Sequence, residues 1–266
     1  MVQKFLNKSF KGTILAMLRF ANKVFSRLSH KTKAGFNYHP LIPYGFYAPW
    51  VTDVDFLRVH EKIKTNTLVD IYKCYELWKL VEETEKVEGC LVEVGVWRGG
   101  SGAVIASKVA ALGSHAAVYL CDTFTGVVKA GSKDSAYEGG EHADTSEDFV
   151  RKLIHQDLGL QNVRILKGIF PEETGHLLNG KKIRFCHIDV DVYNSAKDIL
   201  DFIWNRMDVG AIVVFDDYGY PDMEGITRLV EEGRKKNDRI VVHNLNGHGI
   251  FIKIGTKLSL TDGGRA

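Results

Sequence analysis

The chain has 266 residues, of which 45% are hydrophobic and 26% are charged, and its formal net charge is +2. These values are typical of a globular protein, and no apolar run approaches the roughly 18 residues that a membrane-spanning helix needs. We therefore expect no membrane-spanning segment, and the length fits one α/β domain with an appendage.

Residues 1–52 differ from the rest of the chain in charge, because they contain eight Lys or Arg residues and no Asp or Glu. Apolar residues between positions 5 and 28 recur at helical spacing, with the cations between them. This pattern is typical of a helix at an anionic membrane surface, but also of a helix that packs on its own domain or on a second subunit. We expect residues 1–35 to do one or the other; no nucleic-acid partner is expected.

The segments that follow predict a linker and a helical lead-in. Residues 39–50 are rich in Pro and aromatic residues, as in an extended linker that packs by its rings. Residues 66–86 have apolar side chains at helical spacing and predict a helix. We therefore divide the chain into a basic segment with linker (1–52), a lead-in (53–88), a main domain (89–256) and a tail (257–266).

From Gly89 onward, short apolar runs alternate with helical patterns, which predicts βαβ units and a mostly parallel sheet with helices on both faces. Asn246-Gly247 joins two β-rich runs and predicts a C-terminal antiparallel hairpin. This plan resembles the Rossmann-like sheet of class I methyltransferases. The predicted strands are 90–96, 117–122, 163–167, 183–189, 210–216, 239–245 and 249–254, and the predicted helices are 101–112, 145–157, 171–179, 194–206 and 223–236.

The four cysteines include no CxxC pair, and two of them lie in apolar, strand-like runs. We expect all four to be reduced and structural, which favours a cytosolic location.

A cofactor site is predicted where the first two strands end. The glycines of Gly95-Val96-Trp97-Arg98-Gly99-Gly100 follow a GxxxGG spacing, which allows a tight turn but is not the GxGxxG of dinucleotide sites. Glu93 would meet an α-amino group, and Asp122 can accept hydrogen bonds from two ribose hydroxyls. The predicted cofactor contacts are Glu93, Gly95, Trp97, Gly99, Gly100, Ser101, Asp122, Thr123, Phe124, Gly168 and Ile169.

Carboxylates follow the next two predicted strands, as Asp189 and Asp191 after one strand and Asp216-Asp217 after the other. Acids at neighbouring carboxyl ends converge on the crevice where open α/β sheets bind ligands, and they would repel one another. A hard divalent cation such as Mg²⁺ would resolve that repulsion, so we predict Asp189, Asp216 and Asp217 as its ligands. Capping of helices, or pairing with Lys or Arg, is the alternative role.

Four ordered motifs place the chain near a known family. Val92–Gly100, Cys121–Gly126, Ile188–Tyr193 and Phe215–Tyr218 together resemble the macrocin and mycinamicin sugar O-methyltransferase family, which includes the noviose O-methyltransferase. The resemblance covers roughly residues 68–254. It implies Mg²⁺-dependent methyl transfer from S-adenosylmethionine to a sugar hydroxyl, with Asp191 as general base.

Methyl transfer requires an oriented oxygen that has lost its proton, and Asp191 or His187 could remove it. Regular alternation along the strand would place His187, Asp189 and Asp191 on one side. Residues 126–144 form either a lid that carries His142 and Glu141 over the acceptor or a disordered surface loop; His142 is a further candidate base. A catechol-type methyltransferase, a non-catalytic module that binds S-adenosylmethionine or metal, and a homo-oligomer remain possible readings of the sequence.

Overall fold

The computed structural model describes residues 2–28, 30–32, 35–38, 40, 42 and 45–255, so the predicted tail at 257–266 lies outside the described residues. The chain divides into two compact units, residues 1–49 and 50–266. This division falls close to the predicted boundary at residue 52; the boundaries at 88 and 256 stay predictions. Within the described part of the chain, every helix is too short or too polar to cross a membrane.

The N-terminal unit contains helix α1 (Val2–Phe25), a 3₁₀ turn (Ser26–Leu28) and a small antiparallel pair, β1 (His30–Lys31) with β2 (Asn37–Tyr38). The side-chain amide of Asn22 on α1 is hydrogen bonded to both the N–H and the C=O of Ile42. This contact joins the helix to the segment that follows the strand pair.

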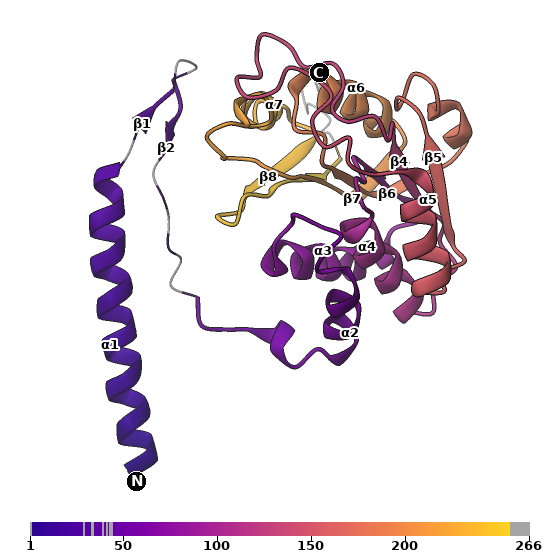
Figure 1. Cartoon of the computed structure of the whole chain (residues 1–266). Helices are drawn as coiled ribbons and strands as arrows, with labels where there is room; N and C mark the ends of the chain where they lie inside the picture. The colour runs from indigo at the N-terminus through magenta and orange to yellow at the C-terminus, as the bar shows by residue number, and fades with distance from the viewer. Residues whose placement is uncertain are drawn as a thin grey trace, which may run out of the picture. The chain divides into compact units, whose positions relative to one another are not determined.

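The second unit is built on a seven-stranded sheet with the order β5-β4-β3-β6-β7-β9-β8 (Figure 1). Strands β3 to β7 pair in parallel, β9 is antiparallel to β7, and β8 is antiparallel to β9. Strand order reverses beside β3, which is where open α/β sheets place their ligands. The bounds are β3 (Cys90–Val94), β4 (Val118–Asp122), β5 (Val163–Lys167), β6 (Ile183–Ile188), β7 (Met207–Phe215), β8 (Arg239–His243) and β9 (Gly249–Lys253).

Alternation along the strands divides the core into two layers, one on each face of the sheet. Leu91, Phe185 and Val214 face one layer with helices α2 to α5, while their neighbours Val92 and Phe215 face the other with α6 and α7 (Figure 1). The helices are α2 (Val54–Ile63), α3 (Ile71–Glu83), α4 (Gly100–Ala111), α5 (Glu147–Arg151), α6 (Tyr193–Trp204) and α7 (Glu224–Gly233). The predicted fold class is confirmed. All four cysteines are buried and free, as predicted.

Three helix predictions differ from the structure. Residues 171–179 form turns and a 3₁₀ helix (Gly175–Leu178), where the Glu173 carboxylate accepts from the N–H of Ile169 and Gly175 packs tightly on Phe202. The helix predicted over 145–157 continues from α5 as a π-helix at Lys152–Asp157. The helix predicted from residue 66 begins only at Ile71, because Asp70 caps it by accepting from two backbone N–H groups.

Candidate active site

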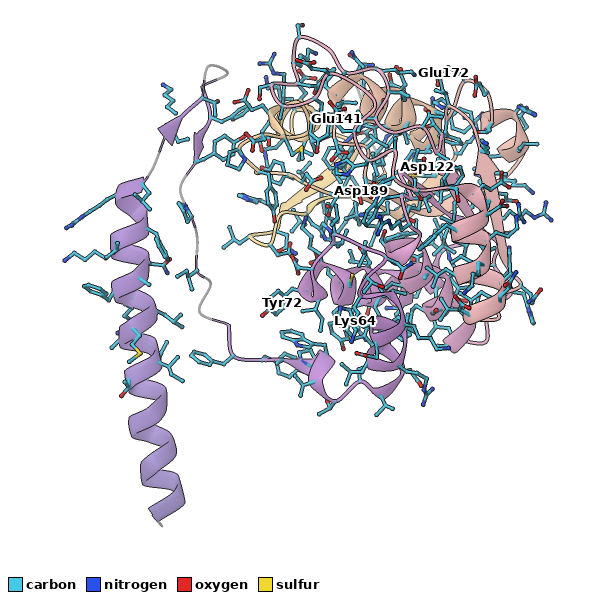
Figure 2. The ribbon with its side chains drawn as sticks, in the orientation of Figure 1. Lys64, Tyr72, Asp122, Glu141, Glu172 and Asp189 are labelled. Atoms are coloured by element: carbon cyan, nitrogen blue, oxygen red, sulfur yellow. The ribbon has the colours of Figure 1, made fainter. Side chains whose placement is uncertain are left out.

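A cavity of about 300 Å³ opens where β3, β4, β6 and β7 end. Its lining contains residues from both predicted halves, including Gly95 and Asp122 from one and Asp189 and Asp217 from the other. Figure 2 shows Asp122 and Asp189 at this edge of the sheet, with Glu141 in the loop beside them. A cofactor and an acceptor could therefore meet in one cavity.

The glycine-rich turn brings β3 close to β6 at the cavity. Gly95 has a φ of +87°, and a Cβ at this position would lie 1.6 Å from the carbonyl oxygen of Asp189. Only glycine allows this approach. Gly99, also in the left-handed region with a φ of +87°, turns the chain into α4.

Asp122 organises the same turn. Its Oδ2 accepts from the N–H groups of Val96 (2.6 Å) and Trp97 (2.9 Å), and its Oδ1 accepts from the N–H of Phe124 (2.6 Å). Each carboxylate oxygen has further accepting capacity, so Asp122 can fix the turn and still accept from a ribose hydroxyl.

The other predicted cofactor contacts divide into two groups. Trp97, Ser101, Thr123, Gly168 and Ile169 line the cavity, whereas Gly99, Gly100 and Phe124 stand behind its lining.

Glu93 and His187 occupy different places from those predicted. Both side chains are fully buried outside the cavity lining, and His187 Nδ1 is hydrogen bonded to Glu93 Oε1 at 2.9 Å. In this position Glu93 does not face an α-amino group in the cavity, and His187 does not face an acceptor. The cause is register: the two residues are direct cross-strand neighbours, so each carries the polar group that the other needs.

The strand-end acids gather as predicted, but not by regular alternation. β6 ends at Ile188, and Asp191 and Asp217 both have positive φ, of 63° and 61°. Such conformations in non-glycine residues concentrate at functional sites. One oxygen each from Asp189, Asp191 and Asp217 lies within 4.8 Å of the others, while Asp216 belongs to a second group with His187 and His248.

These acids perturb one another strongly. Burial, followed by repulsion from Asp216 and Asp217, raises the pKa of Asp189 well above its usual value. Burial and the neighbouring Asp216 raise the pKa of Asp217 to about 8. Burial also raises the pKa of Asp191, against the attraction of His142. Without a cation, the cluster therefore binds protons near neutral pH.

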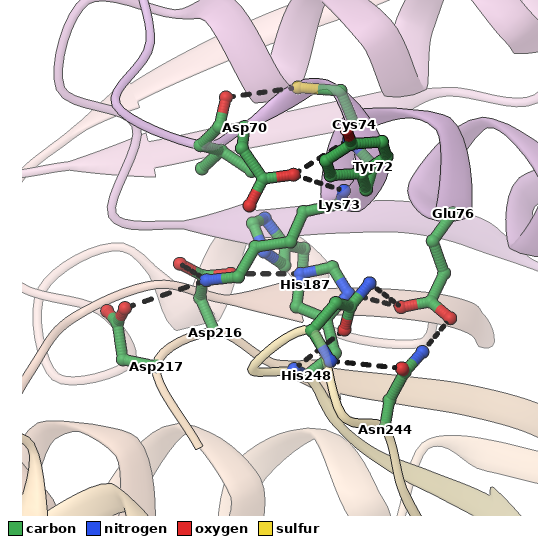
Figure 3. Close-up of polar contacts among 12 residues, drawn as sticks. Asp70, Tyr72, Lys73, Cys74, Glu76, His187, Asp216, Asp217, Asn244 and His248 are labelled. Atoms are coloured by element: carbon green, nitrogen blue, oxygen red, sulfur yellow. Dashed lines mark hydrogen bonds and ion pairs between the residues drawn. The ribbon is translucent and has the colours of Figure 1, made fainter. Parts of the chain in front are cut away.

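Asp216 differs because cations surround it (Figure 3). Lys73 Nζ lies 2.9 Å from Asp216 Oδ1, and His248 Nε2 lies 2.9 Å from the same oxygen. Burial opposes ionisation of Asp216, but His248 and Lys73 outweigh it and lower the pKa of Asp216. On the far side of the imidazole, His248 Nδ1 lies 2.6 Å from Glu76 Oε2.

The loop at residues 126–144, predicted as a lid or a disordered loop, packs against the cavity. Trp97 Nε1 donates to Asp144 Oδ1 at 2.8 Å, and the His142 ring lies 6.5 Å from the Trp97 ring and 6.2 Å from the Tyr137 ring. His142 and Tyr137 both line the cavity. Burial and the charges of Asp191 and Asp217 raise the pKa of Tyr137, which keeps its hydroxyl protonated beside Asp191.

Sequence reasoning missed Lys73, Glu76, His248 and Tyr137. A signal for Lys73 exists, because it stands four residues before buried Leu77 on the face of α3 that packs inward. A lysine in that stripe indicates a buried partner. His248 and Tyr137 lie in loops, where no periodicity marks them.

Comparison with known proteins identifies relatives of most of the second unit. Residues 65–251 match the family described as macrocin O-methyltransferase (TylF). The chain is 29% identical over 164 residues to an 8-demethyl-8-(2,3-dimethoxy-α-L-rhamnosyl)-tetracenomycin-C 4′-O-methyltransferase of Streptomyces olivaceus. It is 28% identical over 166 residues to a demethyldecarbamoylnovobiocin O-methyltransferase of Streptomyces niveus. Each match covers 58% of this chain and 62% of the relative.

Solved structures show the same fold. The O-methyltransferase NovP superposes with a TM-score of 0.60 at 25% identity, over 71% of this chain and 82% of that one. The calicheamicin methyltransferase CalS11 gives a TM-score of 0.59 at 18% identity, over 78% of this chain and 94% of that one.

Proposed function

The chain belongs to the macrocin O-methyltransferase family, and from this membership we propose that it transfers a methyl group from S-adenosylmethionine to a hydroxyl of a sugar or glycosylated acceptor, with the help of Mg²⁺. The main support for this proposal is that the turn around Asp122 and the strand-end acids line the same cavity. The relative from Streptomyces olivaceus, whose name specifies O-methylation of a rhamnosyl-tetracenomycin, supports the acceptor class.

The strand-end acids fit a hard divalent cation. Asp189, Asp216 and Asp217 offer oxygen donors, which Mg²⁺ prefers, and burial followed by mutual repulsion raises the pKa of Asp189 and Asp217. We keep these three as the proposed ligands, since Asp216 and Asp217 are the charges that affect Asp189 most. When bound, Mg²⁺ would lower the pKa of a coordinated hydroxyl.

Asp191 is the proposed general base. Its carboxyl group interacts with His142, Asp217 and Tyr137, and both His142 and Tyr137 line the cavity. The pKa of Asp191 is raised, which brings it closer to the neutral pH at which a general base works best. Asp191 would accept the hydroxyl proton as the oxygen bonds to the methyl carbon and the methyl–sulfur bond of S-adenosylmethionine breaks, with its electron pair left on sulfur. Tyr137 and His142 would shield that step from water.

S-adenosylmethionine would bind at the turn that contains Gly95 and Trp97. Asp122 would accept hydrogen bonds from its ribose, and Ile169 would lie beside its adenine. S-adenosylmethionine supplies the methyl group when bound. The bound cofactor would bury Ser101 and Thr123, which also line the cavity.

Calorimetric titration with S-adenosylmethionine, NAD and Mg²⁺, followed by product mass after turnover with sugar conjugates and with catechols, tests this proposal. We expect binding of the first and third ligands and a mass gain of one methyl group on a sugar conjugate. Methylation of catechols alone would indicate the catechol-type reading, and binding without turnover would indicate a non-catalytic module. No binding of S-adenosylmethionine would refute the proposal.

We also propose that residues 1–35 contact an anionic membrane surface, which would keep the enzyme in the cytosol at the inner face of a membrane. Met17, Phe20 and Leu28 are 65%, 70% and 61% exposed and share one side of the helical segment. Lys23 and Arg27 follow along one edge of this strip. Apolar insertion combined with basic charge is how interfacial helices bind anionic lipids.

Co-sedimentation with phosphatidylserine and phosphatidylcholine vesicles tests the membrane contact. The full chain should pellet with phosphatidylserine vesicles, and a chain without residues 1–35 should not. Equal binding of both chains would refute the contact. A full chain that does not bind vesicles but forms dimers through this segment would show that the strip packs on a second subunit.

A further inference from the structure

Lys73 is a buried cation directed at the proposed metal ligands. It lies in the first turn of α3 and is 3% exposed, and its Nζ is 2.9 Å from Asp216 Oδ1 and 3.7 Å from Asp217 Oδ1 (Figure 3). The ammonium thus lies beside both residues of the Asp pair. Lys73 also lines the cavity.

The surroundings of Lys73 hold the ammonium near the acids. Its Nζ lies 4.9 Å from the centre of the Tyr220 ring, a cation–π distance. Gly247, with a φ of +98°, leaves room for the lysine stem, since a Cβ there would lie 3.1 Å from Lys73 Cε. The lysine is therefore packed in place.

Asp216 has a second support that is independent of Lys73. His248 is 2.9 Å from Asp216, and Glu76 is 2.6 Å from the other nitrogen of that imidazole. Loss of the lysine contact would therefore leave Asp216 still supported. The lysine adds positive charge at the acids more than it adds mechanical support.

An ammonium and a divalent cation cannot both use these oxygens freely, because they repel each other at short range in a poorly hydrated site. We infer that Lys73 is a positioning residue that pairs with Asp216 and Asp217 in the metal-free enzyme and competes with the divalent cation for them. Lys73 thereby sets the metal affinity of the site. This inference rests on the proposed metal dependence.

Mn²⁺ titration of the full chain, followed by electron paramagnetic resonance of the free ion, tests the competition. Lys73→Met keeps the length of the side chain but removes its charge, and we expect it to bind Mn²⁺ at least about tenfold more tightly than the wild type. Lys73→Arg keeps the charge and should bind within about threefold of the wild type. Lys79→Met is the matched control on the exposed side of the same helix, where Lys79 pairs with Glu82, and should change nothing.

Thermal unfolding supplies a second measurement. Without metal, Lys73→Met should melt below the wild type because the acids lose their counter-charge, and Mn²⁺ should raise its melting temperature by more than that of the wild type. A residue with only a structural role would lower stability without strengthening metal binding. Lys73→Gln is neutral but still donates hydrogen bonds, and it replaces Lys73→Met if that variant does not fold.

The outcomes separate the two proposals. Folded Lys73→Met and Lys73→Gln chains that bind Mn²⁺ no more tightly than the wild type would overturn the competition while leaving metal dependence intact. Absence of Mn²⁺ binding by the wild type and by both neutral variants would overturn the proposed metal dependence and the competition with it.

Discussion

His187 Nδ1 and Glu93 Oε1 are hydrogen bonded at 2.9 Å across β6 and β3, and both side chains are fully buried. Glu93→Gln keeps the volume and an oxygen that accepts from His187 but replaces the carboxylate with a neutral amide, so we expect it to lower the free energy of unfolding by about 1 kcal/mol, the difference between a charge-assisted and a neutral hydrogen bond. Urea unfolding measures this loss. Affinity for S-adenosylmethionine should stay near the wild-type value.

Glu83→Gln is the control, since Glu83 pairs with Lys86 on the surface and the loss of that pair should cost little. A Glu93→Gln chain that unfolds like the wild type but binds S-adenosylmethionine tenfold more weakly would show instead that Glu93 reaches the cofactor.

Asp191→Asn should lower kcat by about 10²–10⁴-fold, the usual contribution of a general base. Because Asp191 is not among the proposed metal ligands, the affinity for Mn²⁺ should change little. Rapid-quench kinetics and Mn²⁺ titration measure the two effects separately. If both fall together, Asp191 is a ligand, which its place in the group with Asp189 and Asp217 would then explain.

Mg²⁺ binding should release protons at pH 7. Burial and Asp216 raise the pKa of Asp217 to about 8, and burial, followed by repulsion from Asp216 and Asp217, raises the pKa of Asp189 well above its usual value, so the acid group retains protons at pH 7 that the cation must displace. The cation binds the deprotonated form, so affinity should increase as the pH rises from about 6 to about 8. Calorimetry in two buffers with different ionisation enthalpies measures the released protons. A binding enthalpy that is the same in both buffers would contradict the raised pKa values.

The sheet and the place of its ligand site could be predicted because periodicity and chain order determine them. Short apolar or β-rich runs predicted all seven strands of the main sheet. The acids at two strand ends indicated where Asp189 and Asp217 meet. Glycine spacing likewise identified the turn that Asp122 supports.

Contacts between distant segments could not be predicted in this way. Lys73 reaches Asp216 across 143 residues, and His248 reaches Glu76 across 172. Neither pair follows from local spacing, since both depend on how α3 and the β8–β9 turn pack on the sheet. Strand register also places Glu93 beside His187 and outside the cavity lining. Such a pairing can be predicted only when it is known which strands are neighbours in the sheet.

Asp144 connects the loop at residues 126–144 to the rest of the cavity wall. Asp144 accepts from Trp97 Nε1 at 2.8 Å and lies 2.6 Å from Arg98, so it ties the end of this loop to the glycine-rich turn. Asp144→Ala should loosen the loop, increase amide hydrogen exchange at residues 126–144 and raise the KM for the acceptor several-fold.

Exposed Asp148, on α5, gives the control variant Asp148→Ala. Because the acids and Asp191 keep their places in the Asp144→Ala chain, kcat at saturating acceptor should fall less than kcat/KM does. Unchanged exchange in the loop together with unchanged KM would mean that other contacts, such as the hydrogen bond from Ser195 to the carbonyl of Val128, are sufficient to fix it.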